Sequence, residues 1–191
     1  MSRESGDLSD QQLVALSLGG DDRAFGEIVR RHRDVLYRVA FASLSNADDA
    51  LDAIQEVFVS AHAALRRFDA SRELRPWLTT ITLNRCRDIA RRRRVRRLFA
   101  FAMPIEEAAE TIAFDTPSAE TEAADREELA RTAKAIANLP ASLREPLVLH
   151  AVSGLSQSET AQTLKISEKA VETRLRRARQ QLRAVLAATN N

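Results

Sequence analysis

The sequence predicts an all-α protein of two small helical domains joined by a flexible acidic linker, the second domain containing a helix-turn-helix. Apolar residues recur every three or four positions along most of the chain, which is the spacing of amphipathic helices. Glycine and proline number only five each among 191 residues, too few for a turn-rich β protein. Charge is segregated into blocks, with net charges of +8 over residues 72–97, −6 over residues 98–135 and +5 over residues 164–183.

The first domain is predicted to span residues 1–97. A short helix over residues 8–18 begins at Ser9 or Asp10, which have good capping side chains, and ends at the pair Gly19-Gly20. Asp21 and its neighbour then begin a second helix. The sequence therefore places two amphipathic helices before residue 46.

Residues 46–66 form the predicted third helix, because its apolar side chains follow one another at steps of three and four. Residues 68–76 break this spacing and are expected to form a loop. Pro76 is suited to the first turn of the following helix, which leads into the arginine-rich block. Cys86 lies in this helix between two arginines, and we expect a buried structural thiol there rather than a reactive one.

Residues 98–125 form the predicted linker, since they have weak periodicity, two prolines and an excess of acids. A short helix is expected within them at residues 105–112. The second domain, residues 126–191, begins with an apolar stripe and continues with a helix that Pro140 starts and Gly154 ends. The acidic segment thus separates two basic, helical regions.

The end of the chain matches a helix-turn-helix. Residues 156–159 resemble a capping box that begins its first helix, and residues 165–167 form the tight turn. Inward apolar positions of the second helix leave one polar, mostly basic side exposed, as in a helix that reads the major groove. This predicted recognition face consists of Lys169, Glu172, Thr173, Arg176 and Arg177.

Several classes of function are disfavoured. A single cysteine excludes a disulfide scaffold and a cysteine-based zinc site. His32, His62 and His150 are isolated, without the spacing of metal ligands, and no glycine-rich phosphate loop is present. We therefore expect no enzyme, no metal and no cofactor. The sequence has no signal peptide and no apolar run of membrane-spanning length, which predicts a cytoplasmic protein without membrane insertion.

Several motifs together resemble the extracytoplasmic-function sigma factors, the small bacterial subunits that give RNA polymerase its promoter specificity. The resemblance rests on residues 49–58, 68–78 and 84–88 with the following arginines, and on Leu139-Pro140, Arg144-Glu145-Pro146 and the helix-turn-helix after them. It covers residues 21–186. It implies core RNA polymerase and promoter DNA as partners, with an anti-sigma factor as the family's usual regulator and no small-molecule substrate.

The resemblance also divides the work between the domains. The first would bind the polymerase and open the minus-ten element, and the second would read the minus-thirty-five element as duplex. These elements lie about 25 base pairs apart, which is roughly 85 Å of DNA. One small domain, with a radius of gyration near 12 Å, cannot reach both.

Two residue sets follow from the resemblance. The docking face, which would contact the polymerase, consists of Asp49, Asp52, Gln55 and Glu56. The capture surface, which would hold the unpaired minus-ten strand, consists of Asp69, Ser71, Arg72, Arg75, Trp77, Asn84, Arg87, Arg91 and Arg92. Trp77 is either a core anchor or a stacking platform for a base. Asp88 is expected to pair with an arginine of its own domain.

Some features leave other interpretations open. Glu172 stands where the family commonly has a basic residue, so the promoter sequence is not transferable from relatives. The acidic linker either mimics nucleic acid or is a simple tether. The alternative function is a stand-alone helix-turn-helix regulator, and a third is a basic protein-interaction module.

Overall fold

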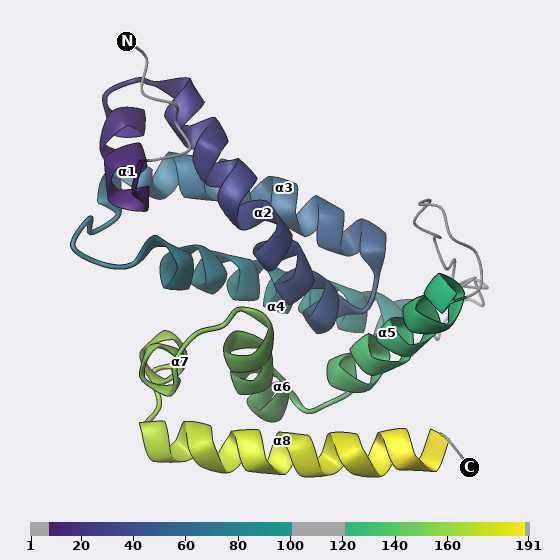
Figure 1. Cartoon of the computed structure of the whole chain (residues 1–191). Helices are drawn as coiled ribbons and strands as arrows, with labels where there is room; N and C mark the ends of the chain where they lie inside the picture. Colours follow the sequence, from purple (N-terminus) through teal and green to yellow (C-terminus); the bar gives the residue numbers. More distant parts are fainter. Residues whose placement is uncertain (1–7, 101–120, 190–191) are drawn as a thin grey trace.

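The computed structural model describes residues 8–100 and 121–189 and is helical throughout, with no β-strand in these ranges (Figure 1). The described part of the N-terminal half contains four α-helices and one 3-10 turn, η2. The second and fourth helices contact one another, and the third packs on both. The elements are α1 (Asp10–Leu18), α2 (Asp22–Leu44), α3 (Ala47–Ala64), η2 (Leu65–Arg67) and α4 (Leu74–Ala100).

Side-chain caps fix where these helices begin, as the sequence predicts. Ser9 and Gln12 form a reciprocal capping box at α1, with N···O distances of 2.8 and 3.3 Å. Asp21 accepts a hydrogen bond from the Arg23 amide at 2.9 Å, and Asn46 accepts one from the Asp49 amide at 2.8 Å. One boundary was predicted wrongly: α4 begins at Leu74, inside the predicted loop, because Leu74 is itself buried in the core.

A single apolar cluster stabilises the N-terminal half. Leu13 of α1, Ile28 and Leu36 of α2, and Leu78 of α4 are all fully buried in it. Burial of such side chains contributes about 1.5–3 kcal/mol each. The loop before α4 is held by Phe68, whose ring lies at the edge of the same cluster.

The C-terminal half is smaller and contains the predicted helix-turn-helix (Figure 1). Leu143, Val171 and Leu175 are buried between its helices. The elements are α5 (Thr121–Ala137), α6 (Ala141–Leu147), the π-helical turn η3 (Val148–Val152), α7 (Gln157–Leu164) and α8 (Glu168–Thr189). Pro140 precedes α6 and Gly154 follows η3 with φ of 76°, so both predicted boundaries are confirmed.

The change from α6 to η3 was not predicted. Pro146 lies inside α6 and lacks the amide hydrogen of an ordinary helical residue. The regular series of backbone hydrogen bonds is therefore interrupted at this position. The helix then widens, and the Ser153 amide donates to the Val148 carbonyl at 3.0 Å. Val148 and Leu149 in this turn are both fully buried.

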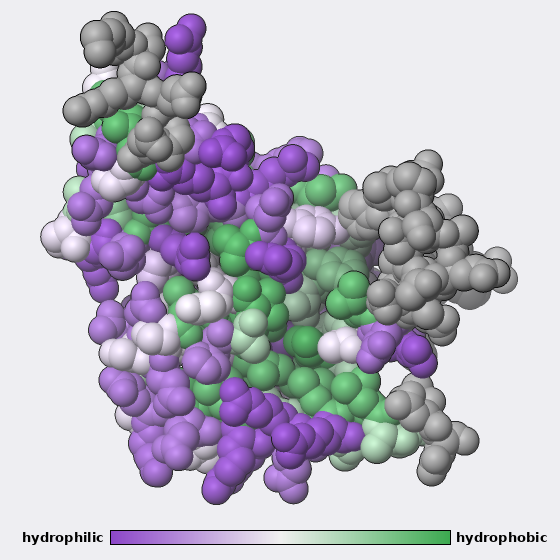
Figure 2. Space-filling model, in the orientation of Figure 1, coloured by the Kyte–Doolittle hydropathy of each residue, from purple (hydrophilic) through white to green (hydrophobic). Residues whose placement is uncertain are grey.

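The two halves pack against one another, which the sequence reasoning did not anticipate. Val39 and Leu83 of the N-terminal half share one buried cluster with Val148, Leu149 and Leu155 of the C-terminal half. Figure 2 shows apolar side chains over α5, α6 and the end of α2, between hydrophilic borders. The predicted tether is therefore not the only connection between the halves.

The predicted linker overlaps both neighbouring helices. Residues 98–100 belong to α4 and residues 121–125 belong to α5. The short helix expected at residues 105–112 lies outside the described residues. The helices of the described part do not combine the length and hydropathy that crossing a bilayer requires.

Candidate nucleic-acid interface

The recognition face lies on the outer side of α8. Ser167 caps this helix, accepting a hydrogen bond from the Ala170 amide at 3.2 Å. Val171 and Leu175 are buried on its inner side, with exposures of 0% and 2%. The helical repeat then directs the recognition face to solvent, so the predicted orientation is confirmed.

Local pairing changes the charge of the recognition face. Lys169 Nζ lies 3.0 Å from Glu172 Oε2, one turn apart on the helix. Thr173 Oγ1 donates to the Lys169 carbonyl at 2.9 Å. The Lys169 ammonium partly neutralises the Glu172 carboxylate, and the exposed Arg176 and Arg177 supply the remaining positive charge. This arrangement suits phosphates and guanine edges.

The remaining parts of the helix-turn-helix hold α8 in place. Ser156 and Glu159 form a capping box at α7: the Glu159 amide donates to Ser156 Oγ at 3.1 Å, and the Ser156 amide donates to the Glu159 carboxylate at 2.8 Å. Hydrogen bonding of the carboxylate to the side chain and the backbone amide of Ser156 lowers the pKa of Glu159. Lys165 ends α7 with a left-handed φ of 55°, which allows the tight turn. Ile166 packs into the cluster between the helices. The predicted motif is confirmed in each of these details.

The loop at the start of the capture surface is ordered by its own hydrogen bonds. The Asp69 carboxylate accepts from the Ser71 hydroxyl at 2.7 Å and from the Ser71 amide at 3.0 Å, and these bonds lower the pKa of Asp69. The rings of Phe68 and Trp77 lie 4.8 Å apart. Trp77 is half-buried and packs on the core while it also lines a cavity, so both roles considered for it remain available.

Several arginines of α4 are paired with other side chains. Arg87 donates to both carboxylate oxygens of Glu145 in α6, each at 2.7 Å, and to Asn84 Oδ1 at 2.9 Å. Arg91 pairs with Asp88 at 2.7 Å, which confirms the intradomain partner predicted for that carboxylate. Arg72 and Arg92 are exposed. Part of the capture surface is thus engaged within the protein.

The docking face lies on α3, where its four residues share one side of the helix. Asp52 and Gln55 are exposed, whereas the other two members form ion pairs with arginines of α4. Asp49 pairs with Arg93, and Glu56 pairs with Arg85. The free negative charge of this face is therefore smaller than the sequence indicates.

A cavity of about 600 Å³ lies between the capture surface and the helix-turn-helix. Asp69, Arg72 and Trp77 line one side. Glu159 and Lys165 of the C-terminal half line the other. The loop that was predicted to receive an unpaired base therefore faces α7.

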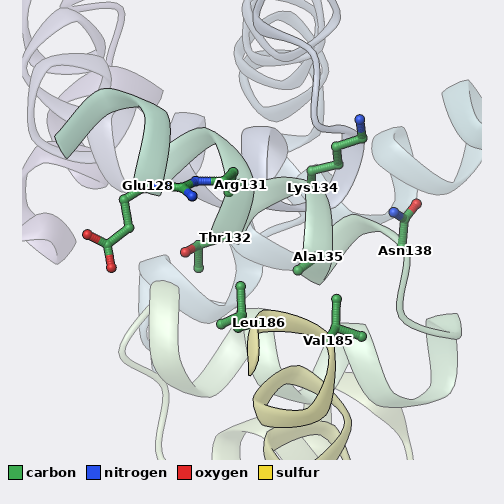
Figure 3. Close-up of a pocket in the computed structure, with 8 residues that line it drawn as sticks. All are labelled: Glu128, Arg131, Thr132, Lys134, Ala135, Asn138, Val185 and Leu186. Carbon is green, nitrogen blue, oxygen red and sulfur yellow. The ribbon is translucent and has the colours of Figure 1, made fainter. Parts of the chain in front are cut away.

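A second cavity, of about 520 Å³, lies wholly within the C-terminal half between α5 and the end of α8. Figure 3 shows Val185 and Leu186 of α8 pointing toward Thr132 and Ala135 of α5. No predicted site residue lines this cavity. Val185 and Leu186 lie in the last turns of α8, beyond the recognition face at residues 169–177.

Comparison with known proteins identifies both halves. The family description "Sigma-70 region 2" matches residues 28–96, and "Sigma-70, region 4" matches residues 129–182. The RNA polymerase sigma factor CnrH of Cupriavidus metallidurans is 42% identical over 182 residues, which cover 94% of this chain and 95% of CnrH. This chain belongs to the sigma-70 family. The sigma factor therefore directs core RNA polymerase to specific promoters.

Other relatives place it in the extracytoplasmic-function group. The ECF sigma factor SigM of Mycobacterium tuberculosis is 32% identical over 182 residues, covering 95% of this chain and 87% of SigM. A solved structure of CnrH in complex with the cytosolic domain of CnrY has a TM-score of 0.70 at 36% identity, covering 94% of this chain and 97% of CnrH. RpoE of Bartonella quintana, solved with the anti-sigma factor NepR, has a TM-score of 0.64 at 26% identity, covering 84% of this chain and 97% of RpoE.

Sequence reasoning missed the residues of the sigma factor that join its halves. Glu145 is the partner of Arg87 across the interface. The buried hydroxyls of Ser153 and Thr79 lie 3.1 Å apart, Oγ to Oγ1. One signal was present in the sequence. Residues 146–149 are four consecutive apolar residues, so their side chains point to several sides of the helix and cannot all be buried against one neighbouring helix. The described residues contain no cluster of three His, Cys, Asp or Glu that could hold a metal.

Proposed function

We propose that this sigma factor opens promoters by capturing the unpaired minus-ten strand on its capture surface while the recognition face reads the minus-thirty-five duplex. The docking face would bind core RNA polymerase, and the protein would act in the cytoplasm without catalysing a reaction. One observation supports the proposal. The same chain has an exposed recognition helix and, separately, a cavity lined by arginine and Trp77.

The chemistry of the capture surface supports its role. A reader of single-stranded DNA needs positive charge for the backbone and an apolar or aromatic surface for a base. Arg72 supplies charge at the mouth of the cavity, Trp77 supplies the ring, and Asn84 offers an amide for a base edge. Promoter opening would then use the free energy of binding the unpaired strand.

An anti-sigma factor is a further proposed partner. The relatives CnrH and RpoE were each solved with a bound protein, CnrY and the anti-sigma factor NepR respectively. This chain has the same fold over most of its length. A protein of that class would regulate it by limiting its access to polymerase.

Run-off transcription tests the function directly. Core RNA polymerase with this sigma factor is expected to start discrete transcripts on genomic fragments, and those start sites reveal the promoter. Absence of transcripts from every fragment would contradict the proposal.

Arg72→Ala then separates opening from upstream recognition. We expect it to reduce permanganate reactivity of unpaired thymines near the start site while binding to the upstream duplex stays unchanged. Arg131→Ala is the matched control, because Arg131 is exposed on α5 outside all three predicted surfaces. Equal losses in both variants would show that only overall charge matters.

A further inference from the structure

The interface between the halves is apolar and well buried. Val39, Ala42 and Leu83 of the N-terminal half contact Val148 and Leu149 across it, and all five are no more than 6% exposed. Separation of the halves would expose this surface to water, at a free-energy cost that grows with the apolar area. The closed arrangement is therefore favoured unless another interaction compensates.

Polar contacts at the edge of this interface are specific. The Thr79 and Ser153 hydroxyls hydrogen-bond within it at 3.1 Å. At the rim, Glu145 presents two oxygens to Nε and Nη2 of Arg87, a bidentate geometry that a DNA phosphate also offers to arginine. The hydrogen bonds that Arg87 donates to the Glu145 carboxylate raise the pKa of Arg87. The Glu145 carboxylate thus engages Arg87 in the geometry that a phosphate could also adopt.

The closed arrangement also restricts the rest of the capture surface. Arg72 and Trp77 face Glu159 and Lys165 of α7 across the cavity described above. The Arg75 guanidinium lies against Gly154 in the turn after η3. A DNA strand that followed the arginines of α4 would meet the C-terminal half.

We propose that Glu145 is an autoinhibitory latch that mimics a DNA phosphate on Arg87, so that closure of the two halves and capture of the unpaired strand exclude one another. The inference rests on the proposed function of the capture surface. The recognition face lies outside the latch and stays exposed in the closed form. Closure therefore blocks one promoter element and leaves the other readable.

The size of the effect follows from the exposure of the pair. The Glu145 side chain is 14% exposed and that of Arg87 is 47% exposed, so solvent screens the interaction in part. Apparent affinity falls in proportion to the fraction of open molecules. We expect loss of the latch to raise that fraction, and the affinity for single-stranded DNA, about three- to fivefold.

Glu145→Gln in the full chain tests this, with Glu128→Gln as the matched control. Glu128 is exposed on α5, and its substitution changes the net charge equally. Spin labels at Ala63→Cys in α3 and Gln180→Cys in α8 report the separation of the halves, because both positions are exposed. A fluorescent single-stranded oligonucleotide of random sequence reports the capture surface.

The latch predicts that Glu145→Gln adds a population with a longer label distance and binds the oligonucleotide three- to fivefold more tightly than Glu128→Gln does. A charge-swapped protein, Arg87→Glu with Glu145→Arg, should restore the short distance that Arg87→Glu alone loses. Distances or affinities indistinguishable from those of Glu128→Gln would overturn the proposal. The wild-type run-off assay described above fails independently if the proposed function is wrong.

Discussion

Leu175→Ala tests whether the two halves unfold separately. Leu175 is 2% exposed in the cluster between α6 and α8. A buried Leu→Ala change costs about 2–5 kcal/mol, and we expect about 2–3 kcal/mol because this cluster is small and its neighbours can relax. In a unit of about 60 residues, that loss lowers the melting temperature by about 10–20 °C.

Two spectroscopic probes distinguish the halves. Far-ultraviolet circular dichroism follows the helices of both, whereas fluorescence follows Trp77, the single tryptophan, which packs on Phe68 in the N-terminal half. We expect Leu175→Ala to move an early dichroism transition to lower temperature while the main fluorescence transition stays in place. The N-terminal half has its own core, which remains intact in the variant.

The control removes the same atoms from an exposed site. Leu129 is 68% exposed on α5, so Leu129→Ala should change stability by no more than about 0.5 kcal/mol. If dichroism and fluorescence instead shift together in one transition, the shared cluster joins the halves into a single cooperative unit. The predicted division into domains would then be wrong.

Three further results are expected. Arg177→Ala should weaken binding to the upstream duplex by about 1–3 kcal/mol if the side chain contacts a base, with association with core polymerase unchanged; loss of that association would refute the assigned role. Burial raises the pKa of Cys86 to about 12, so iodoacetamide should label it only as the protein unfolds, and rapid labelling of the native protein would be inconsistent with this. Hydrogen bonds from Arg30 and Arg31 lower the pKa of Glu27 from 4.5 to about 2, so its stabilising contribution is complete above about pH 4.5 and lost as pH falls toward 2. Urea unfolding of Glu27→Gln should therefore show a free energy of unfolding that falls less steeply between pH 4.5 and pH 2 than that of the wild type. An unchanged pH dependence would contradict this assignment.

Local signals in the sequence were sufficient for most helix boundaries. Ser9, Asp21, Asn46 and Ser156 each cap the helix that the sequence assigns to them, because capping depends on residues only two or three positions apart. The burial of Cys86 was likewise predictable from the apolar side of its helix. These features require no knowledge of distant contacts.

Features that depend on distant residues were not predictable in this way. The pairing of Asp49 with Arg93 and of Arg87 with Glu145 joins positions 44 and 58 residues apart. The spacing of charges along one helix shows which residues share a side, but not which of them find partners on another element. The docking face therefore has less free charge than expected, and part of the capture surface is occupied.

Closure also has consequences for which ligand can open the protein. A ligand shifts a conformational equilibrium only by its difference in affinity for the two states. Arg176 and Arg177 are exposed in the closed form, so the upstream duplex alone gains little from opening. In the proposed latch, the unpaired strand would bind Arg87, which pairs with Glu145 in the closed form. Simultaneous engagement of two elements roughly 85 Å apart requires separation as well. Opening of the sigma factor should therefore accompany the combined capture of both elements, not the first contact with duplex DNA.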